Sequence, residues 1–131
     1  MTSSLNYLSA TQLIEKLSNK EISSAELLEE TISRIETVDT QINAVVIRDF
    51  NQARIAAKEA DTAIMRGESK PLLGLPITVK ESFHITGLPT TWGNPAFKNW
   101  TPTADALAIT RLKNAGAIII GNVQIIGKIA E

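Results

Sequence analysis

The sequence predicts an α/β fold in which helices from the first part of the chain pack on a small sheet. Serine-led capping boxes at Ser9 and Ser23 indicate two early helices. Short, mainly apolar runs at 44–47, 75–79 and 117–120 indicate strands. A helical pattern between the last two runs favours a right-handed crossover, so we expect those two strands to be parallel.

Residues 8–67 are predicted to be mainly helical. A short helix follows the first capping box and a longer helix follows the second. The longer helix has an apolar stripe made of Leu28, Ile32 and Ile35. After the strand over 44–47, Asp49 is expected to cap a third helix that ends near Arg66, and this helix carries a face of alanines.

Residues 71–121 are predicted to run strand, loop, helix, strand. The loop over 81–102 is rich in glycine and proline and has no helical periodicity. A loop of this length is usually functional or disordered, and its aromatic residues and few charges argue against disorder. A helix from Thr103 or Asp105 to about Asn114 then leads into the last strand.

Composition excludes several classes of function. The formal net charge of -1 gives no electrostatic reason to expect nucleic acid or an anionic membrane as a partner. The chain has no cysteine and a single histidine, His84, so we expect no metal and no other cofactor. No apolar run approaches the ~20 residues of a membrane helix, and the first residues do not resemble a signal peptide, so a cytoplasmic protein is expected.

The main candidate for chemistry is Lys80, which ends an apolar strand and is followed by Glu81. Burial of a cation costs free energy, and desolvation by Ile77 and Val79 would favour the neutral amine, which can act as a base. The alternative is an ordinary lysine that points into solvent at a strand end. Considered alone, the residues around Lys80 favour this alternative.

Loop 81–102 carries the candidate substrate-binding residues. Thr90 and Thr91 either offer their hydroxyls to a substrate or cap turns of their own loop. Aromatic side chains either line a pocket or anchor the loop to the domain, and these are Trp92, Phe97 and Trp100.

Two weaker candidates complete the set. His84 has no spaced partner, which is more typical of a loop residue than of a base or a metal ligand. The segment Gly121-Asn-Val-Gln124 follows an apolar strand, where the ligand sites of parallel sheets gather.

Several segments together resemble the amidase signature family. They are Pro71-Leu-Leu-Gly-Leu-Pro-Ile-Thr-Val-Lys80, Gly87-Leu-Pro-Thr-Thr-Trp-Gly93, Asp105-Ala106 and Arg111-Leu-Lys-Asn-Ala-Gly-Ala-Ile-Ile-Ile-Gly121. The segments Glu21-Ile-Ser-Ser-Ala-Glu-Leu27 and Ile42-Asn-Ala-Val45 are similar to the helical region that begins this family's domain. The resemblance extends from about Leu8 over nearly the whole chain. Residues Trp92 to Phe97 are more similar to stand-alone amidases than to the amidase subunit of tRNA-dependent amidotransferases.

The resemblance implies a mixed sheet, of which this chain holds the first strands, and a Ser-Ser-Lys triad in which Lys80 is the base. In the family pattern both serines and the segment that forms the oxyanion hole follow the position of Glu131. The only serine after Lys80 is Ser82, which lies two residues away on no glycine-rich turn and is no substitute. The residues after Gly121 also depart from the family's Gly-Lys-Thr-Asn, and Glu81 stands where Asp is common.

The sequence therefore predicts an amidase-like hydrolase represented by its N-terminal part, residues 1–131. The resemblance implies that this chain lacks the serine nucleophile, the bridging serine and the oxyanion hole, of which the last is worth a few kcal/mol. The chain alone is therefore expected to be inactive. A small-molecule amide is the expected substrate if a missing part completes the site. The alternatives are a non-catalytic structural or interaction protein derived from an amidase, and a degraded gene product without a selected role.

Two structural expectations follow from the resemblance. Lys80 should be mostly buried, with its amine facing a polar pocket formed by loop 81–102. Residues 77–79 and 118–130 should leave unpaired strand edges and apolar faces, so a homo-oligomer or a complementary chain is expected to cover them.

Overall fold

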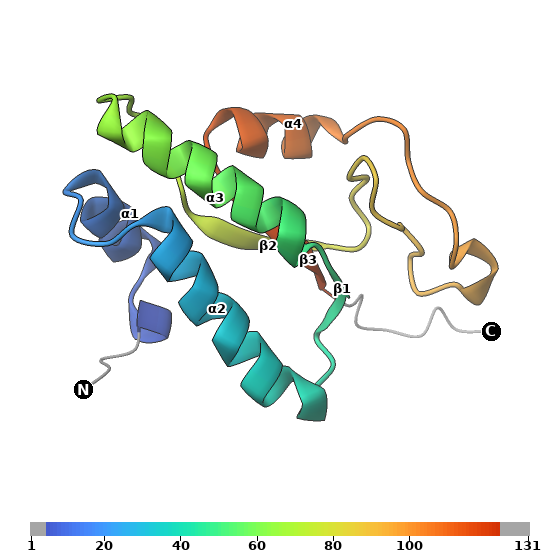
Figure 1. Cartoon of the computed structure of the whole chain (residues 1–131). Helices are drawn as coiled ribbons and strands as arrows, with labels where there is room; N and C mark the ends of the chain where they lie inside the picture. The colour runs from blue at the N-terminus through green and yellow to red at the C-terminus, as the bar shows by residue number, and fades with distance from the viewer. Residues whose placement is uncertain (1–4, 124–131) are drawn as a thin grey trace.

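The computed structural model describes residues 5–123. Four α-helices lie in this part of the chain: α1 (Ala10–Ser18), α2 (Ser24–Val38), α3 (Phe50–Met65) and α4 (Leu107–Asn114). Single turns of 3-10 helix are η1 (Leu5–Tyr7), η2 (Asp39–Gln41) and η3 (Pro95–Phe97). Figure 1 shows α2 and α3 side by side along the sheet, with α4 on its own beside the long loop that precedes it.

The predicted capping boxes begin α1 and α2. Ser9 Oγ accepts a hydrogen bond from the backbone N–H of Gln12 at 3.2 Å, and Ser23 Oγ accepts one from Glu26 at 3.0 Å. In return the side chains of Gln12 and Glu26 each accept from the capping residue's N–H at 2.8 Å. These reciprocal bonds satisfy backbone donors that have no partner within a helix, which fixes where both helices start.

The sheet has three strands in the order β1–β3–β2: β1 (Val45–Arg48), β2 (Pro76–Lys80) and β3 (Ile118–Val123). β2 and β3 are parallel, as predicted, and their register pairs Pro76 with Ile118 and Lys80 with Val123. β1 pairs with β3 in the antiparallel direction, and only with residues 121–123. The sheet is therefore mixed, with β3 in the centre and β2 at an edge among the described residues.

Helices cover both faces of the sheet. Alternate side chains of a strand point to opposite faces, so Ile118 and Ile120 face one way and Ile119 the other. The first face packs against α2 and α3 in a core of Leu28, Ile32, Ala53, Ala57, Ala60, Ile118 and Ile120. The second face packs against α4 and the long loop in a core of Val79, Ile85, Leu88 and Ile109. Each fully buried leucine or isoleucine contributes about 1.5–3 kcal/mol.

Three expectations about element ends are wrong. Asp49 precedes α3, but its side chain makes no capping hydrogen bond. α4 begins at Leu107, because the carboxylate of Asp105 accepts instead from the Thr86 N–H at 2.7 Å and from Lys113 Nζ at 2.8 Å. β3 continues to Val123 because its last three residues pair with both neighbouring strands.

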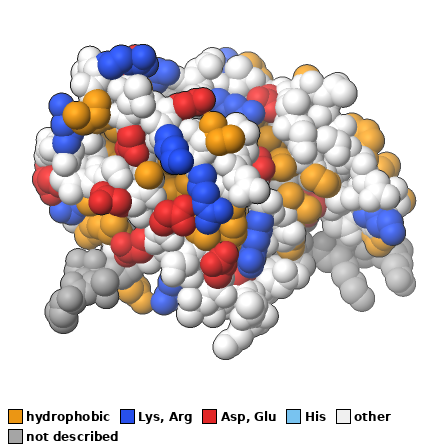
Figure 2. Space-filling model, viewed as in Figure 1, with side chains coloured by type: hydrophobic (Ala, Val, Ile, Leu, Met, Phe, Trp, Pro, Cys, Tyr) orange, Lys and Arg blue, Asp and Glu red, His pale blue; other side chains and the backbone are white. Residues whose placement is uncertain are grey.

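Charged side chains of both signs are mixed over the helical face of the molecule (Figure 2). The loop after β2, residues 81–106, has only three charged residues, Glu81, Lys98 and Asp105. Within the described residues, no helix has the length and apolar character to cross a membrane.

Candidate functional site

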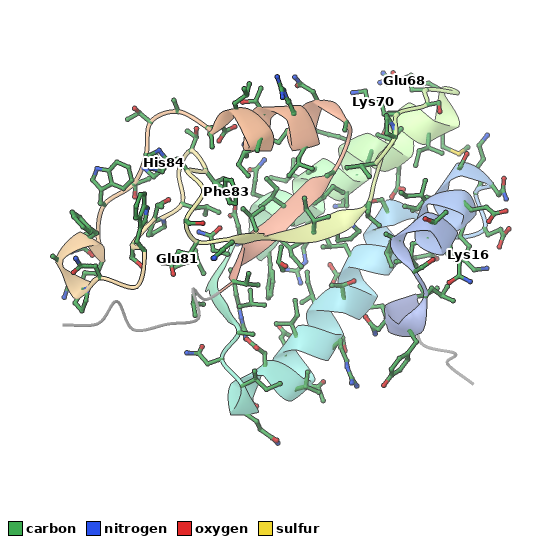
Figure 3. All side chains as sticks on the ribbon, turned by 180° about the vertical axis from the view of Figure 1, so that it is seen from behind. Lys16, Glu68, Lys70, Glu81, Phe83 and His84 are labelled. Carbon is green, nitrogen blue, oxygen red and sulfur yellow. The ribbon has the colours of Figure 1, made fainter. Side chains whose placement is uncertain are left out.

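The candidate site lies at the carboxyl ends of β2 and β3 and in the loop over 81–106. The two strands end together, because Lys80 pairs with Val123 and the Glu81 N–H donates to the Val123 carbonyl at 3.1 Å. Glu81, Phe83 and His84 follow one another along the loop beyond β2 (Figure 3). In parallel sheets, ligand sites form outside this end of the strands.

Lys80 is exposed, so the expectation that it is mostly buried is wrong for this chain. β2 is an edge strand, and its alternation turns Val79 into the core and Lys80 outward. Within residues 5–123, the Lys80 amine has neither a hydrogen bond nor an ion pair, and it does not line the aromatic pocket described below. The lysine is thus held at the expected place in the fold but with a solvated amine.

Thr91 is bound to its own loop. Its hydroxyl donates to Glu81 Oε1 and accepts from the Gly93 N–H at 3.3 Å. Glu81 itself is only 4% exposed, which is unusual for a carboxylate that directly follows a strand. The Thr91 hydroxyl therefore binds within its own loop and holds it against Glu81. Of the two alternatives for Thr91, the structure favours a hydroxyl that binds its own loop over one that is free for a substrate.

Thr90 differs from Thr91 because its hydroxyl makes no hydrogen bond within residues 5–123. The residue is 1% exposed, and Thr90 Oγ1 has no hydrogen-bond partner among the described residues. Its backbone N–H donates to the Trp100 carbonyl at 3.1 Å, which ties the two sides of the loop together. A buried hydroxyl without a partner costs about 1–3 kcal/mol.

Asn122 was missed as an individual candidate because it was expected in a loop. The structure places Gly121, Asn122 and Val123 in β3, while Gln124 lies outside the described residues. Asn122 is fully buried, and its Nδ2 donates to the Pro89 carbonyl at 3.2 Å, while its Oδ1 has no partner in the described part of the chain. An asparagine so soon after three isoleucines was the sequence signal for a polar group inside the sheet.

Aromatic side chains of the loop line an open pocket of about 240 Å³, which we call the aromatic pocket. Its lining residues are His84, Thr90, Trp92, Phe97 and Trp100. The rings of His84 and Trp100 meet edge to face, with centroids 5.0 Å apart. Of the two alternatives for the tryptophans, the structure favours the lining of a pocket over the anchoring of the loop. Both side chains line the hollow and are nearly half exposed.

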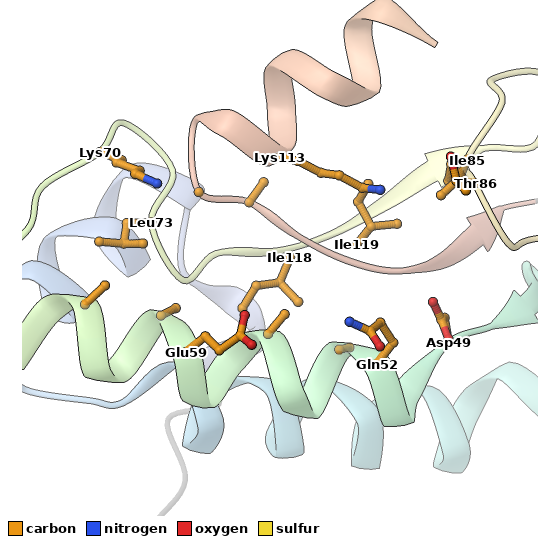
Figure 4. A pocket seen from close by; sticks show the side chains of 16 residues that line it. Asp49, Gln52, Glu59, Lys70, Leu73, Ile85, Thr86, Lys113, Ile118 and Ile119 are labelled. Carbon is orange, nitrogen blue, oxygen red and sulfur yellow. The ribbon is translucent and has the colours of Figure 1, made fainter. Parts of the chain in front are cut away.

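A larger groove of about 560 Å³ lies between α3 and α4 along the start of β3 (Figure 4). Alanines of α3 form one wall. Gln52 and Glu59 of α3 also line the groove, as do Asp49, which precedes α3, and Lys113 on the opposite side. Burial raises the pKa of the Asp49 carboxyl, and the nearby Lys113 charge opposes this only in part. Sequence reasoning missed the groove because its walls come from segments far apart in the chain.

The Asp105–Lys113 pair holds the loop against α4. Burial alone would raise the pKa of Asp105, but hydrogen bonds from Lys113 and Thr86 hold it below its ordinary value.

Across residues 5–123 there is no cluster of three or more metal-ligating side chains.

Comparison with known proteins identifies the family. The model of the Amidase family matches residues 26–126, and the chain therefore belongs to this family. A glutamyl-tRNA(Gln) amidotransferase subunit from Geobacter sp. strain M21 is 40% identical over 113 residues, which are 86% of this chain and 23% of that protein. The corresponding subunit from Roseiflexus castenholzii is 39% identical over 92% of this chain and 24% of its own length.

Solved structures agree with this membership. A chain of a vestigial protein complex that reveals the origins of an s-triazine catabolic enzyme superposes with a TM-score of 0.85 at 34% identity, over 88% of this chain and 26% of that chain. A bacterial aryl acylamidase of the amidase signature family superposes with a TM-score of 0.83 at 29% identity, over 89% of this chain and 25% of its own. The chain thus spans about a quarter of the length of its relatives and matches their N-terminal part.

Proposed function

We propose that this chain supplies the base lysine and part of the substrate wall of an amide hydrolase. The observation that carries the proposal is the position of Lys80, at the carboxyl end of a parallel strand and beside a loop that forms a pocket. A base has to lie within hydrogen-bond reach of the proton that it takes, and the exposed Lys80 amine has no hydrogen bond among residues 5–123. Catalysis therefore requires a further part of the domain that brings a proton donor next to Lys80.

The chemistry assigned to the further part follows the family pattern. A bridging serine would lose its proton to Lys80 and activate a second serine, which attacks the amide carbonyl. Backbone N–H groups would stabilise the oxyanion, a contribution of typically ~3 kcal/mol. Neither serine has a match after Lys80 in this chain, since the only serine there, Ser82, lies in the turn directly after β2. We expect the isolated chain to be inactive for this reason.

A chimera tests the proposal. The chain replaces the matching N-terminal quarter of the aryl acylamidase, and hydrolysis of small aryl and alkyl amides is measured. We expect turnover by the chimera, none by the isolated chain, and a loss of at least ~1,000-fold in the Lys80→Ala chimera. Lys70→Ala, which removes another exposed lysine, is the matched control and should keep the activity.

Two results would contradict this function. One is a chimera that keeps its turnover in the Lys80→Ala form, because Lys80 would then have no part in the reaction. The other is amide hydrolysis by the isolated chain that disappears in Lys80→Ala, because the chain would then hold a nucleophile of its own.

The second candidate function is a non-catalytic interaction module. It is favoured by four exposed aromatic side chains in one loop, Phe83, Trp92, Phe97 and Trp100, which are 42–50% exposed. Two relatives are named as a subunit of an amidotransferase and as a member of a vestigial protein complex, so association with another chain has precedent in the family. A folded chimera without any turnover would favour this second candidate.

A further inference from the structure

The aromatic pocket has an unusually uniform lining. Its five side chains include no carboxylate, no lysine and no arginine. Three of them present large ring surfaces that remain about half exposed, namely Trp92, Phe97 and Trp100. An anionic ligand group would lose its hydration here without gaining a partner charge, so the pocket selects against anions.

The size of the pocket indicates what it holds. An apolar cavity of ~150 Å³ is sufficient for a benzene molecule. The aromatic pocket, at about 240 Å³, has room for one six-membered ring and a small polar group attached to it. Rings prefer offset or edge-to-face contacts, and the His84–Trp100 pair already shows this geometry in the wall.

Thr90 contributes the only hydroxyl of the lining. Oγ1 of this residue is buried and has no hydrogen-bond partner among residues 5–123. The hydroxyl hydrogen turns about the Cβ–Oγ1 bond, so an acceptor atom of a bound molecule that reaches Oγ1 would satisfy it. An uncharged ligand that carries a carbonyl next to its ring would accept this hydrogen bond.

We propose that the aromatic pocket binds the ring of a small uncharged aryl amide, with the amide carbonyl accepting from Thr90. The next residue, Thr91, is hydrogen-bonded to Glu81, which adjoins Lys80, so Thr90 lies near the strand end that carries the lysine. The amide part of the proposal rests on the proposed function, whereas binding of the ring does not.

The chain offers a direct readout of this pocket. It has two tryptophans, and both line the pocket, so tryptophan fluorescence reports on it alone. The 131-residue chain is titrated with acetanilide as the probe, and propionamide serves as the ring-free control. We expect saturable quenching or a spectral shift with acetanilide and none with propionamide. Equal responses to the two probes would overturn the proposal.

A matched pair of variants locates the binding. Phe97 and Phe83 lie in the same loop with similar exposure, 50% and 42%, but only Phe97 lines the pocket. Because both side chains are substantially exposed, neither alanine variant should unfold the chain, which circular dichroism checks. We expect the acetanilide Kd to rise about three- to tenfold in Phe97→Ala and to stay unchanged in Phe83→Ala. An unchanged Kd in Phe97→Ala, or an equal rise in both, would overturn the proposal.

The hydroxyl is tested by Thr90→Val, which keeps the shape of the side chain. We expect weaker binding of acetanilide, about two- to tenfold, and unchanged binding of ethylbenzene, which has no acceptor. Equal effects on both probes would remove the assigned hydrogen bond. Ring binding by a chimera without turnover would leave this inference intact and remove the proposed function. Turnover that is indifferent to Phe97→Ala would do the reverse.

Discussion

The ionised carboxylate of Asp49 lowers the stability of the folded chain. It faces the groove, makes no capping bond to α3, and has its pKa raised by burial. A raised pKa in the folded state means that the proton is held more tightly there than in the unfolded chain. The contribution of Asp49 to the stability of the fold is therefore fully present below the ordinary aspartate pKa. It is lost as the pH rises through the pKa of the folded state.

We expect Asp49→Asn to stabilise the chain near neutral pH, because the amide removes the cost of a half-buried charge. The gain should vanish at about pH 3, where the wild-type carboxyl is protonated. Urea unfolding of both proteins at the two pH values measures this. A gain of the same size at both values would show that charge is not the cause.

The pKa of Asp39 is shifted in the opposite direction, so its contribution to stability depends on pH in the opposite way. Backbone N–H groups of Ala44 and Val45 donate to it at 2.7 and 3.2 Å, and Arg48 Nη2 donates at 3.1 Å. The Ala44 bond, with smaller contributions from Arg48 and Val45, lowers the pKa of Asp39 against the effect of burial. The stability that it contributes is present above the ordinary aspartate pKa and is lost as the pH falls through the folded value.

We therefore expect Asp39→Asn to destabilise the chain near neutral pH and to matter less at about pH 3. The same unfolding experiments measure it, and Asp49→Asn serves as the control of opposite sign. If the loss persists in acid without change, the hydrogen-bond geometry of the loop before β1, and not the charge, depends on Asp39.

At the scale of the elements, Gly121 of β3 is the position at which β1 and β3 approach closely enough to exclude a side chain. A Cβ added at this position would lie 2.1 Å from the Ile47 carbonyl oxygen on β1, which is far inside van der Waals contact. The two backbones approach so closely that only glycine fits.

We expect Gly121→Ala to destabilise the chain by at least about 2 kcal/mol, because β1 must move away from β3. Gly87→Ala is the matched control: Gly87 also has a positive φ, 84°, but no atom within 4 Å of the added Cβ. The control should lose only the backbone strain, about 1 kcal/mol. Thermal unfolding compares the two, and equal losses would contradict the close approach.

The elements that could be predicted from the sequence are those with local causes. The capping boxes at Ser9 and Ser23 act within four residues, so α1 and α2 begin where expected. The parallel pairing of β2 and β3 followed from the helix between them. The end of β3 and the exposure of Lys80 depend on which strands lie next to them, and strand order is not written in any local pattern.

The candidate site divides in the same way. Lys80 and the loop after it could be picked out, because an apolar strand and a glycine- and proline-rich loop are local features. The aromatic pocket could be raised only as one of two alternatives, since it forms when Trp100 returns to pair with Thr90 across the loop. The buried Asn122 required knowledge of a tertiary contact with Pro89.

For the whole molecule, the groove of about 560 Å³ between α3 and α4 is an uncovered hollow whose walls combine alanines and isoleucines with charged residues. Ile118 and Ile119 pair with β2 on one side, while β1 reaches only residues 121–123 on the other. Among residues 5–123, this part of β3 therefore has no strand partner on the side of the groove, and such edges favour pairing with another chain. Covering apolar surface here contributes about 25 cal/mol per Å² before the costs of association.

We therefore expect the 131-residue chain to self-associate, with an average mass that rises with concentration in sedimentation experiments. Ala56→Glu places a charge in the groove wall and should shift the chain toward the monomer. Thr62→Glu adds the same charge on an exposed turn of α3 outside the groove and should leave association unchanged. Circular dichroism checks that both variants keep their helices. A compact monomer at all concentrations that binds no hydrophobic dye would mean that the groove needs no second chain to cover it.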